Sequence, residues 1–277
     1  MREQGTGGSG AVRNRYNVLG VRIAAVDYNS AVEAIIGAAR ARRPLSVSAM
    51  AVHGVMTGAL DPVHRFRLNH LDLLVPDGQP VRWALRWLHR VRLADRVYGP
   101  SLMIKLCERA ADEGIPIFLF GGPDSLMAAL QARLTQRIPR LTIAGVQASR
   151  FRQLTAEEQC ELAETIRLSG AGLAFVGLGC PRQEVCVFEL QPLVSMPLVA
   201  VGAAFSFHAG LLPRAPPVLQ NAGLEWLYRL VQEPRRLWRR YVLLNPLYLA
   251  LVMLQRLGLG RFDPERALAP TESLRFG

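Results

Sequence analysis

Lysine is nearly absent from this chain of 277 residues: Lys105 is the only one, and arginine carries almost all of the positive charge. The formal net charge is +11, which favours an anionic partner such as nucleic acid, an anionic membrane surface or a phosphorylated substrate. Because basic residues do not alternate with aromatic residues through most of the chain, the pattern argues against nucleic acid.

Long apolar runs are missing too. No segment reaches the ~18 uninterrupted apolar residues that a membrane-spanning helix needs, and the closest one, Tyr241 to Gln255, is interrupted by Asn245 and Pro246. Residues 1–14 lack the apolar stretch of a signal peptide and contain many glycines, which predicts a disordered tail. The four cysteines form no C-x-x-C pair, as expected of a reduced, cytoplasmic protein.

Several catalytic signatures are also absent. The chain has no D-x-D carboxylate pair and no His/Cys/Asp spacing typical of a metal site, so we expect neither a dedicated metal ion nor another cofactor, while a loosely held magnesium ion stays open. No junction between a predicted strand and a helix carries the dinucleotide fingerprint G-x-G-x-x-G or the phosphate-binding loop G-x-x-x-x-G-K-[ST]. The serine-hydrolase motif G-x-S-x-G is missing as well.

Continuously apolar segments alternate with helical segments up to residue 204, a pattern typical of a parallel sheet with helices on both faces. We therefore predict an α/β, Rossmann-like catalytic core over residues 15–212. Asn29 or Ser30 is expected to cap the first helix, and Thr155 with Glu158 forms a capping box for a later one. The predicted strands are 16–26 (a strand or hairpin), 45–52, 71–78, 115–122, 141–148, 171–179 and 197–204.

The chain changes character at Pro213. Residues 213–260 mix arginine, aromatic residues and leucine without a strand pattern, which predicts a helical appendage. Helices that lie in a membrane interface have this composition, and the alternative is a solvated basic face on a packing helix. The polar residues 261–277 predict a loose C-terminal tail. The candidates for contact with a lipid diphosphate or the membrane are Arg229, Arg236 and Arg239.

Ligands of an open parallel sheet bind beyond the carboxyl ends of its strands, and four such ends carry candidate residues. Asp77 follows a strand in VPDG and can act as a general base, or it only forms an Asp-Gly turn. Gly121 and Gly122 in FGGPDS let a nucleotide or phosphate approach the backbone, with a tight turn as the alternative. Gly202 ends a strand in VGAAFSFHAG, where the following alanines keep the floor of the site open. His208 is expected to be a hydrogen-bonded structural histidine.

The fourth strand end is VGLGCPRQE, residues 176–184. Gly177 and Gly179 leave the backbone open, Arg182 can pair with phosphate, and Gln183 can hydrogen-bond a sugar or base. Glu184 can accept a hydrogen bond from a sugar hydroxyl, or it only favours the helix N-terminus electrostatically.

Together these motifs resemble the WecG/TagA/CpsF family of bacterial glycosyltransferases (glycosyltransferase family 26) over about residues 16–245. The resemblance rests on the order and spacing of VPDG (75–78), FLFGG (118–122), VGLGCPRQE (176–184), VGAAFSFHAG (201–210), RAP (214–216) and GLEWLYRLVQEPRRLWRRY (223–241).

The resemblance implies an inverting glycosyltransferase that moves a hexose or N-acetylhexosamine from a UDP-sugar to a polyprenyl-diphosphate-linked acceptor. Such enzymes are peripheral on the inner face of the cell membrane and build cell-wall or extracellular polysaccharides such as exopolysaccharide. The resemblance further implies that the arginines of the appendage complete the active site there, and it leaves room for a homo-oligomer.

By position, the family aspartate of P-D-G falls on Asp77, the expected base, and the glutamine of P-R-Q-E falls on Gln183, the second expected catalytic residue. The family's Thr-x-Asn falls on Ser48 and Met50. Serine keeps the hydroxyl but methionine cannot replace the amide, which favours an unacetylated donor sugar such as glucose. The expected UDP-sugar residues are Ser48, Gly121, Gly122, Gly177, Gly179, Arg182, Glu184 and Gly202.

Two other functions stay open on the residues alone. One is a Rossmann-type nucleotide-binding oxidoreductase or methyltransferase, which the missing fingerprint disfavours. The other is a non-catalytic membrane adaptor that uses only the appendage.

Overall fold

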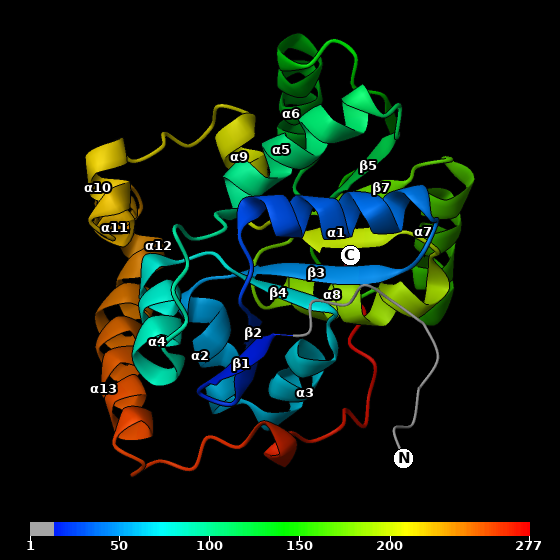
Figure 1. Cartoon of the computed structure of the whole chain (residues 1–277). Helices are drawn as coiled ribbons and strands as arrows, with labels where there is room; N and C mark the ends of the chain where they lie inside the picture. Colours follow the sequence, from blue (N-terminus) through cyan, green and yellow to red (C-terminus); the bar gives the residue numbers. More distant parts are fainter. Residues whose placement is uncertain (1–13) are drawn as a thin grey trace, which may run out of the picture.

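The computed structural model describes residues 14–277, except for the side chains of Pro217, Asn221, Arg236 and Arg240. The tail predicted over residues 1–14 therefore lies, apart from Asn14, outside the described residues. A six-stranded parallel sheet with helices on both faces forms the centre of the molecule (Figure 1). This confirms the predicted α/β, Rossmann-like fold.

The sheet has the strand order β4-β3-β8-β7-β5-β6. Every residue of β4, β5, β7 and β8 is buried, because helices cover both faces and leave no polar side. Each strand falls within a segment predicted from the sequence. The bounds are β3 Leu45–Met50, β4 Leu73–Pro76, β5 Ile117–Phe120, β6 Ile143–Gln147, β7 Leu173–Val176 and β8 Pro197–Ala200.

Two apolar cores lie on the two faces of the sheet. The first is covered by α1 (Tyr28–Arg40), α5 (Gly99–Asp112), α6 (Asp124–Arg137) and α9 (Ala204–His208). The second is covered by α2 (Val52–Leu60), α3 (Pro62–His70), α7 (Ala156–Leu168) and α8 (Arg182–Leu190), which the 3-10 turn η1 (Gln191–Leu193) follows. Together the cores fix the strand ends that carry the candidate residues.

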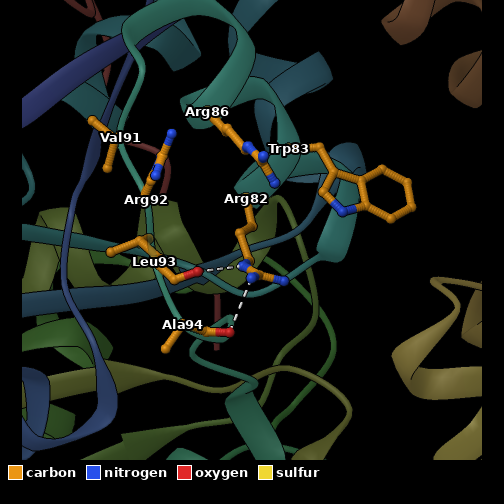
Figure 2. A pocket seen from close by; sticks show the side chains of 7 residues that line it. All are labelled: Arg82, Trp83, Arg86, Val91, Arg92, Leu93 and Ala94. Carbon is orange, nitrogen blue, oxygen red and sulfur yellow. Dashed lines mark hydrogen bonds between the residues drawn. The ribbon is translucent and has the colours of Figure 1, made fainter.

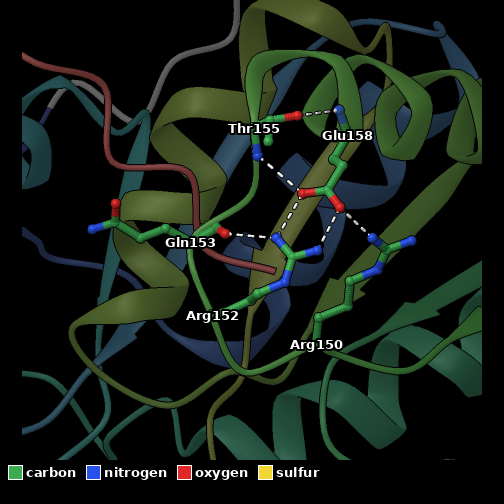
Figure 3. Close-up of polar contacts among 5 residues, drawn as sticks. All are labelled: Arg150, Arg152, Gln153, Thr155 and Glu158. Carbon is green, nitrogen blue, oxygen red and sulfur yellow. Dashed lines mark hydrogen bonds and ion pairs between the residues drawn. The ribbon is translucent and has the colours of Figure 1, made fainter.

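The N-cap of the first helix lies two or three residues earlier than expected. An antiparallel hairpin, β1 (Arg15–Val18) and β2 (Val21–Ala24), precedes it. Asp27 rather than Asn29 or Ser30 caps α1, because Asp27 keeps an extended backbone and its carboxylate accepts from the Ser30 N–H at 2.8 Å. The capping box of Thr155 and Glu158 on α7 is confirmed (Figure 3).

Residues 217–256 are largely helical, and α13 (Leu244–Arg256) packs on the core. Tyr248 and Val252 of the last long helix are inserted into the second core, next to α2 and α4 (Gln79–His89). None of the helices in residues 14–277 is long and apolar enough to cross a membrane. The elements are α10 (Pro217–Asn221), α11 (Glu225–Gln232), α12 (Pro234–Trp238), the π-helical turn η2 (Arg239–Leu243) and α13 (Leu244–Arg256).

The last residues, 261–277, lie along the core and include the short helix η3 (Pro264–Arg266). Asn17 Nδ2 donates to the Phe262 carbonyl at 2.6 Å, and the Leu154 N–H donates to the Arg275 carbonyl at 2.6 Å. Figure 3 shows the neighbouring turn, where Glu158 binds two arginines, Arg150 and Arg152. The polar composition that predicted a loose tail did not reveal these backbone contacts.

Candidate active site

A cleft of about 870 Å³ opens beyond the carboxyl ends of the central strands. It lies where β3, β4, β5, β7 and β8 end, since parallel strands bring these ends to one edge of the sheet. Residues of α11, α12, η2 and α13 line its other side. The predicted residues in its lining are Asp77, Gly122, Gly177, Gly179, Gln183, Glu184, Gly202, Arg229 and Arg239.

Asp77 lies at the end of β4, and its backbone and side chain are both fixed. Its N–H donates to the Met50 carbonyl at 3.1 Å, and its Oδ1 accepts from the Gly99 N–H at 2.9 Å. Burial raises the pKa of Asp77 to about 6, against the opposing effects of Arg96 and the Gly99 hydrogen bond. Such a carboxylate is a stronger base than an exposed one and is still mostly ionised at pH 7.

Two glycine-rich strand ends touch behind the cleft. Gly121, after β5, has a φ of +129°, and a Cβ built on it would lie 2.7 Å from the carbonyl carbon of Gly177. Gly121 therefore permits a close backbone approach and does not itself line the cleft. Gly122 and Gly177 do line it, so the predicted open backbone at these two strand ends faces the ligand space.

Gln183 and Glu184 open α8 and form a buried polar wall of the cleft, with exposed fractions of 3 % and 1 %. Glu184 Oε1 accepts from Gln183 Nε2 at 2.8 Å and from Ser48 Oγ at 2.9 Å. Within the described residues, Gln183 Oε1 and Glu184 Oε2 have no hydrogen-bond partner. Buried acceptors of this kind are costly unless a donor reaches them, which makes them available to a ligand hydroxyl.

Three predicted residues do not line the cleft directly. Ser48 is fully buried and reaches the ligand space only through Glu184, as described above, and Gly121 lies behind the rim. Arg182 is exposed, and its guanidinium carbon lies 5.7 Å from the ring centroid of Phe276. The side chain of Arg236 lies outside the described residues.

A buried polar bridge, which the sequence reasoning missed, connects the core to the C-terminal helices. Glu225 opens α11 and accepts hydrogen bonds from Arg96 Nη2 at 2.6 Å and from Tyr98 Oη at 2.5 Å. Only 9 % of the Arg96 side chain and 11 % of the Glu225 side chain are exposed. The available signal in the sequence was a charged residue within an otherwise apolar segment, namely Arg96 in RVYG and Glu225 in LEWLY.

The bridge adjoins the proposed base. Asp77, Arg96, Glu225 and Arg229 all line a small pocket of about 100 Å³ that shares its wall with the cleft. The Arg229 guanidinium lies 5.6 Å from the ring centroid of Phe207, and its charge also opposes the rise in the pKa of Asp77. The protonation of Asp77 therefore depends on residues from both the core and the appendage.

His208 has the structural role expected for it. Its Nε2 lies 2.8 Å from the Pro100 carbonyl, and burial lowers its pKa to about 4, so the ring is neutral at pH 7. In the part of the chain that the structure describes, no group of three or more His, Cys, Asp or Glu side chains is arranged to hold a metal ion.

The chain matches a known protein family. The sequence model described as "Glycosyl transferase WecG/TagA/CpsF family" matches residues 16–261. The matched range contains the whole sheet, the cleft and the helices up to α13, so every predicted site residue lies inside it.

Proposed function

Because this chain belongs to the WecG/TagA/CpsF family and is therefore a glycosyltransferase, we propose that it moves a sugar from a UDP-sugar to a polyprenyl-diphosphate-linked acceptor. The observation that carries the proposal is Asp77: a fixed carboxylate with a raised pKa, between open glycine loops and arginines. An oxidoreductase, a methyltransferase and a non-catalytic adaptor are set aside, since the family is one of glycosyltransferases.

The proposed reaction is a direct displacement with inversion. The Asp77 carboxylate removes the proton from an acceptor hydroxyl, and the resulting oxygen nucleophile attacks the anomeric carbon of the donor. The bond between that carbon and the β-phosphate oxygen breaks, and its electron pair leaves with UDP. One carboxylate is enough for this chemistry, and the cleft lining holds Asp77 for that role.

The leaving diphosphate needs positive charge, and the cleft lining provides it. Arg229 and Arg239 line the cleft from the appendage, and the N-terminus of α8 adjoins it at Gln183. We assign no dedicated metal ion to this step, and transfer is expected to persist in the presence of EDTA. The role of Arg182 is indirect, because its side chain stacks on Phe276.

We propose that the donor sugar binds beside the wall formed by Gln183 and Glu184. The unpaired Oε1 of Gln183 and Oε2 of Glu184 would accept from its hydroxyls. Met50 is fully buried, and a Cβ built on Gly54 would lie 2.7 Å from its Cε, so it fills the core and offers no amide. We therefore propose a hexose such as glucose as the donor sugar, as in exopolysaccharide synthesis.

The acceptor is lipid-linked, so the cleft must open toward a membrane surface. We propose that the helices after residue 213 bind the inner face of the cell membrane and present their arginines to the acceptor diphosphate. Exposed apolar side chains on these helices support this, namely Leu227, Val231, Trp238, Val242, Met253 and Leu254. A homo-oligomer also stays a proposal.

A donor panel tests the function. Purified protein is incubated with each of several UDP-sugars and a polyprenyl-diphosphate-linked saccharide, and the lipid product and free UDP are quantified. We expect one UDP-hexose to give both products with an inverted anomeric linkage. Binding of UDP without transfer to any lipid acceptor would contradict the proposed acceptor class.

A further inference from the structure

Helix α4 and its C-cap residue Arg90 present an outward face rich in arginine and tryptophan. Its buried side consists of apolar residues, among them Val81, Ala84 and Leu85. At helical spacing, the opposite side carries Arg82, Trp83, Arg86, Trp87 and Arg90. Of these, Arg86, Trp87 and Arg90 are exposed, and 49 % of the Trp87 surface faces solvent.

A basic hollow of about 390 Å³ lies between α4 and the loop of residues 91–94 (Figure 2). Arg82 fixes the loop, because its Nε donates to the Leu93 carbonyl at 2.8 Å and its Nη2 donates to the Ala94 carbonyl at 2.9 Å. Arg86 and Arg92 line the same hollow from the helix and from the loop, and its lining contains no acidic side chain. Because Arg82 is engaged with the loop carbonyls, an anion in the hollow would meet the guanidinium groups of Arg86 and Arg92.

The hollow adjoins the C-terminal helices. Trp83 lines it and packs against the turn before α11, where a Cβ built on Gly223 would lie 2.8 Å from Trp83 Cη2. The Tyr248 hydroxyl of α13 donates to the Pro80 carbonyl of α4 at 3.2 Å. Figure 1 shows α4 and α13 side by side at the same edge of the molecule.

We propose that α4 and the 91–94 loop form a binding site for the phosphate of an anionic lipid headgroup, as a second membrane contact beside the C-terminal helices. Guanidinium groups bind phosphate oxygens in a bidentate manner, and tryptophan favours the headgroup region of a bilayer. The two chemistries occur together on this helix face, so a membrane is the partner that matches both. The inference rests on the proposed function in one respect, namely that the protein works at a membrane.

The test reverses the charges of Arg86 and Arg92, whose side chains form no hydrogen bond or ion pair within the described residues. In the variant with Arg86→Glu and Arg92→Glu, Arg82 still holds the loop. Co-sedimentation is measured with phosphatidylcholine vesicles with and without phosphatidylglycerol. We expect the variant to lose at least about ten-fold in affinity for the anionic vesicles and little for the neutral ones.

The matched control carries Arg43→Glu and Arg140→Glu. Both are exposed and precede β3 and β6, at the end of the sheet opposite the cleft, and Arg140 loses an exposed ion pair with Asp112. Because two arginines become glutamates in both proteins, the net charge changes equally. The control is expected to keep most of the anionic vesicle binding. An equal loss in control and variant would overturn the site, because it would show a response to net charge alone.

Two further measurements identify the source of the phosphate. Brominated lipids should quench the fluorescence of the native protein more than that of Trp87→Phe, which places the helix in the bilayer interface. If inorganic phosphate stabilises the native protein but not the variant while vesicle binding is equal in both, the site takes free phosphate and the lipid proposal is wrong.

The outcome is separable from the proposed function. Transfer to a water-soluble acceptor analogue is expected to be unchanged in the variant, because the hollow is not part of the cleft lining. If the native protein showed no transfer at all but the vesicle difference persisted, the lipid site would stand and the proposed reaction would fail.

Discussion

At the scale of single residues, Asp77 shows how burial produces reactivity. A carboxylate at a strand end is ordinary, but this one is removed from water and still has one oxygen held by the Gly99 N–H. Burial disfavours the ionised form, and the nearby Arg96 and Arg229 limit that effect, so the pKa rises to about 6 and no further. The result is a carboxylate whose pKa lies close to physiological pH, as the proposed role of general base requires.

The substitution Asp77→Asn is expected to lower kcat by about 10²- to 10⁴-fold, because the amide cannot accept the acceptor proton. The melting temperature at pH 8 should be unchanged or higher, since an ionised buried carboxylate has been removed. Transfer assays and thermal unfolding measure the two effects. Asp112→Asn, an exposed residue paired with Arg140, is the control and should keep full activity.

The pH dependence follows from the same pKa. Asp77 must be ionised to act as a base, so kcat/KM should rise with pH through an apparent pKa near 6 and then level off. Stability responds oppositely. The folded pKa is above the ordinary value of 3.8, so the contribution of Asp77 to stability is present below about pH 4 and is lost as the pH rises through 6. A flat rate profile between pH 5 and pH 8 would argue against Asp77 as the base.

At the scale of elements, the start of α11 is joined to the core by the Glu225 bridge. Its carboxylate accepts hydrogen bonds from Arg96 and Tyr98, and these three side chains line the same small pocket as Asp77. Neutralising Arg96 in this way lessens the positive charge that would otherwise depress the pKa of Asp77. Docking of the helix and the pKa of the proposed base are therefore coupled, and we propose Glu225 as a positioning residue.

Glu225→Gln is expected to move the acid limb of the kcat/KM profile to lower pH and to lower kcat about ten-fold, because Arg96 loses its counter-charge. Stability should fall by about 3 kcal/mol, since a buried cation is left unpaired. Glu265→Gln, which breaks an exposed pair with Arg22, is the control. Lower stability with an unmoved pH profile would reduce Glu225 to a structural role.

At the scale of the whole molecule, the C-terminal part passes from the cleft to the far side of the core. Arg229 and Arg239 line the cleft, Tyr248 and Val252 are inserted into the second core, and the final residues bind β1 and the turn before α7. Deleting everything after residue 224 would thus damage folding as well as the proposed membrane contact. Substitutions of exposed charged residues separate the effect on folding from the effect on the proposed membrane contact, because they leave the buried contacts in place.

Deletion of residues 261–277 tests the contacts of the final segment. We expect the melting temperature to fall by at least about 4 °C, because hydrogen bonds to Asn17 and Leu154 are lost with the buried end of the chain. Leu268→Ala, at a residue that is 58 % exposed, is the control and should leave the melting temperature nearly unchanged. An unchanged melting temperature in the deletion variant would show that these contacts add no stability.

The sequence by itself determined the class of fold and the position of the strand ends. Continuous apolar strands separated by amphipathic helices allow only a covered parallel sheet, and this sheet places Asp77, Gly122, Gly177, Gln183 and Gly202 at one edge. Four of the family motifs, VPDG, FLFGG, VGLGCPRQE and VGAAFSFHAG, lie at these strand ends and could be recognised from the same residues.

Only the tertiary structure decided which polar groups meet. Ser48 and Glu184 are 136 positions apart, and Arg96 and Glu225 are 129 positions apart, so no local pattern could pair them. The exclusion of Gly121 and Arg182 from the cleft lining likewise depends on contacts with Gly177 and Phe276. Burial and pairing are properties of the packed chain, and they alone set the pKa of Asp77 and leave Gln183 and Glu184 with free acceptors.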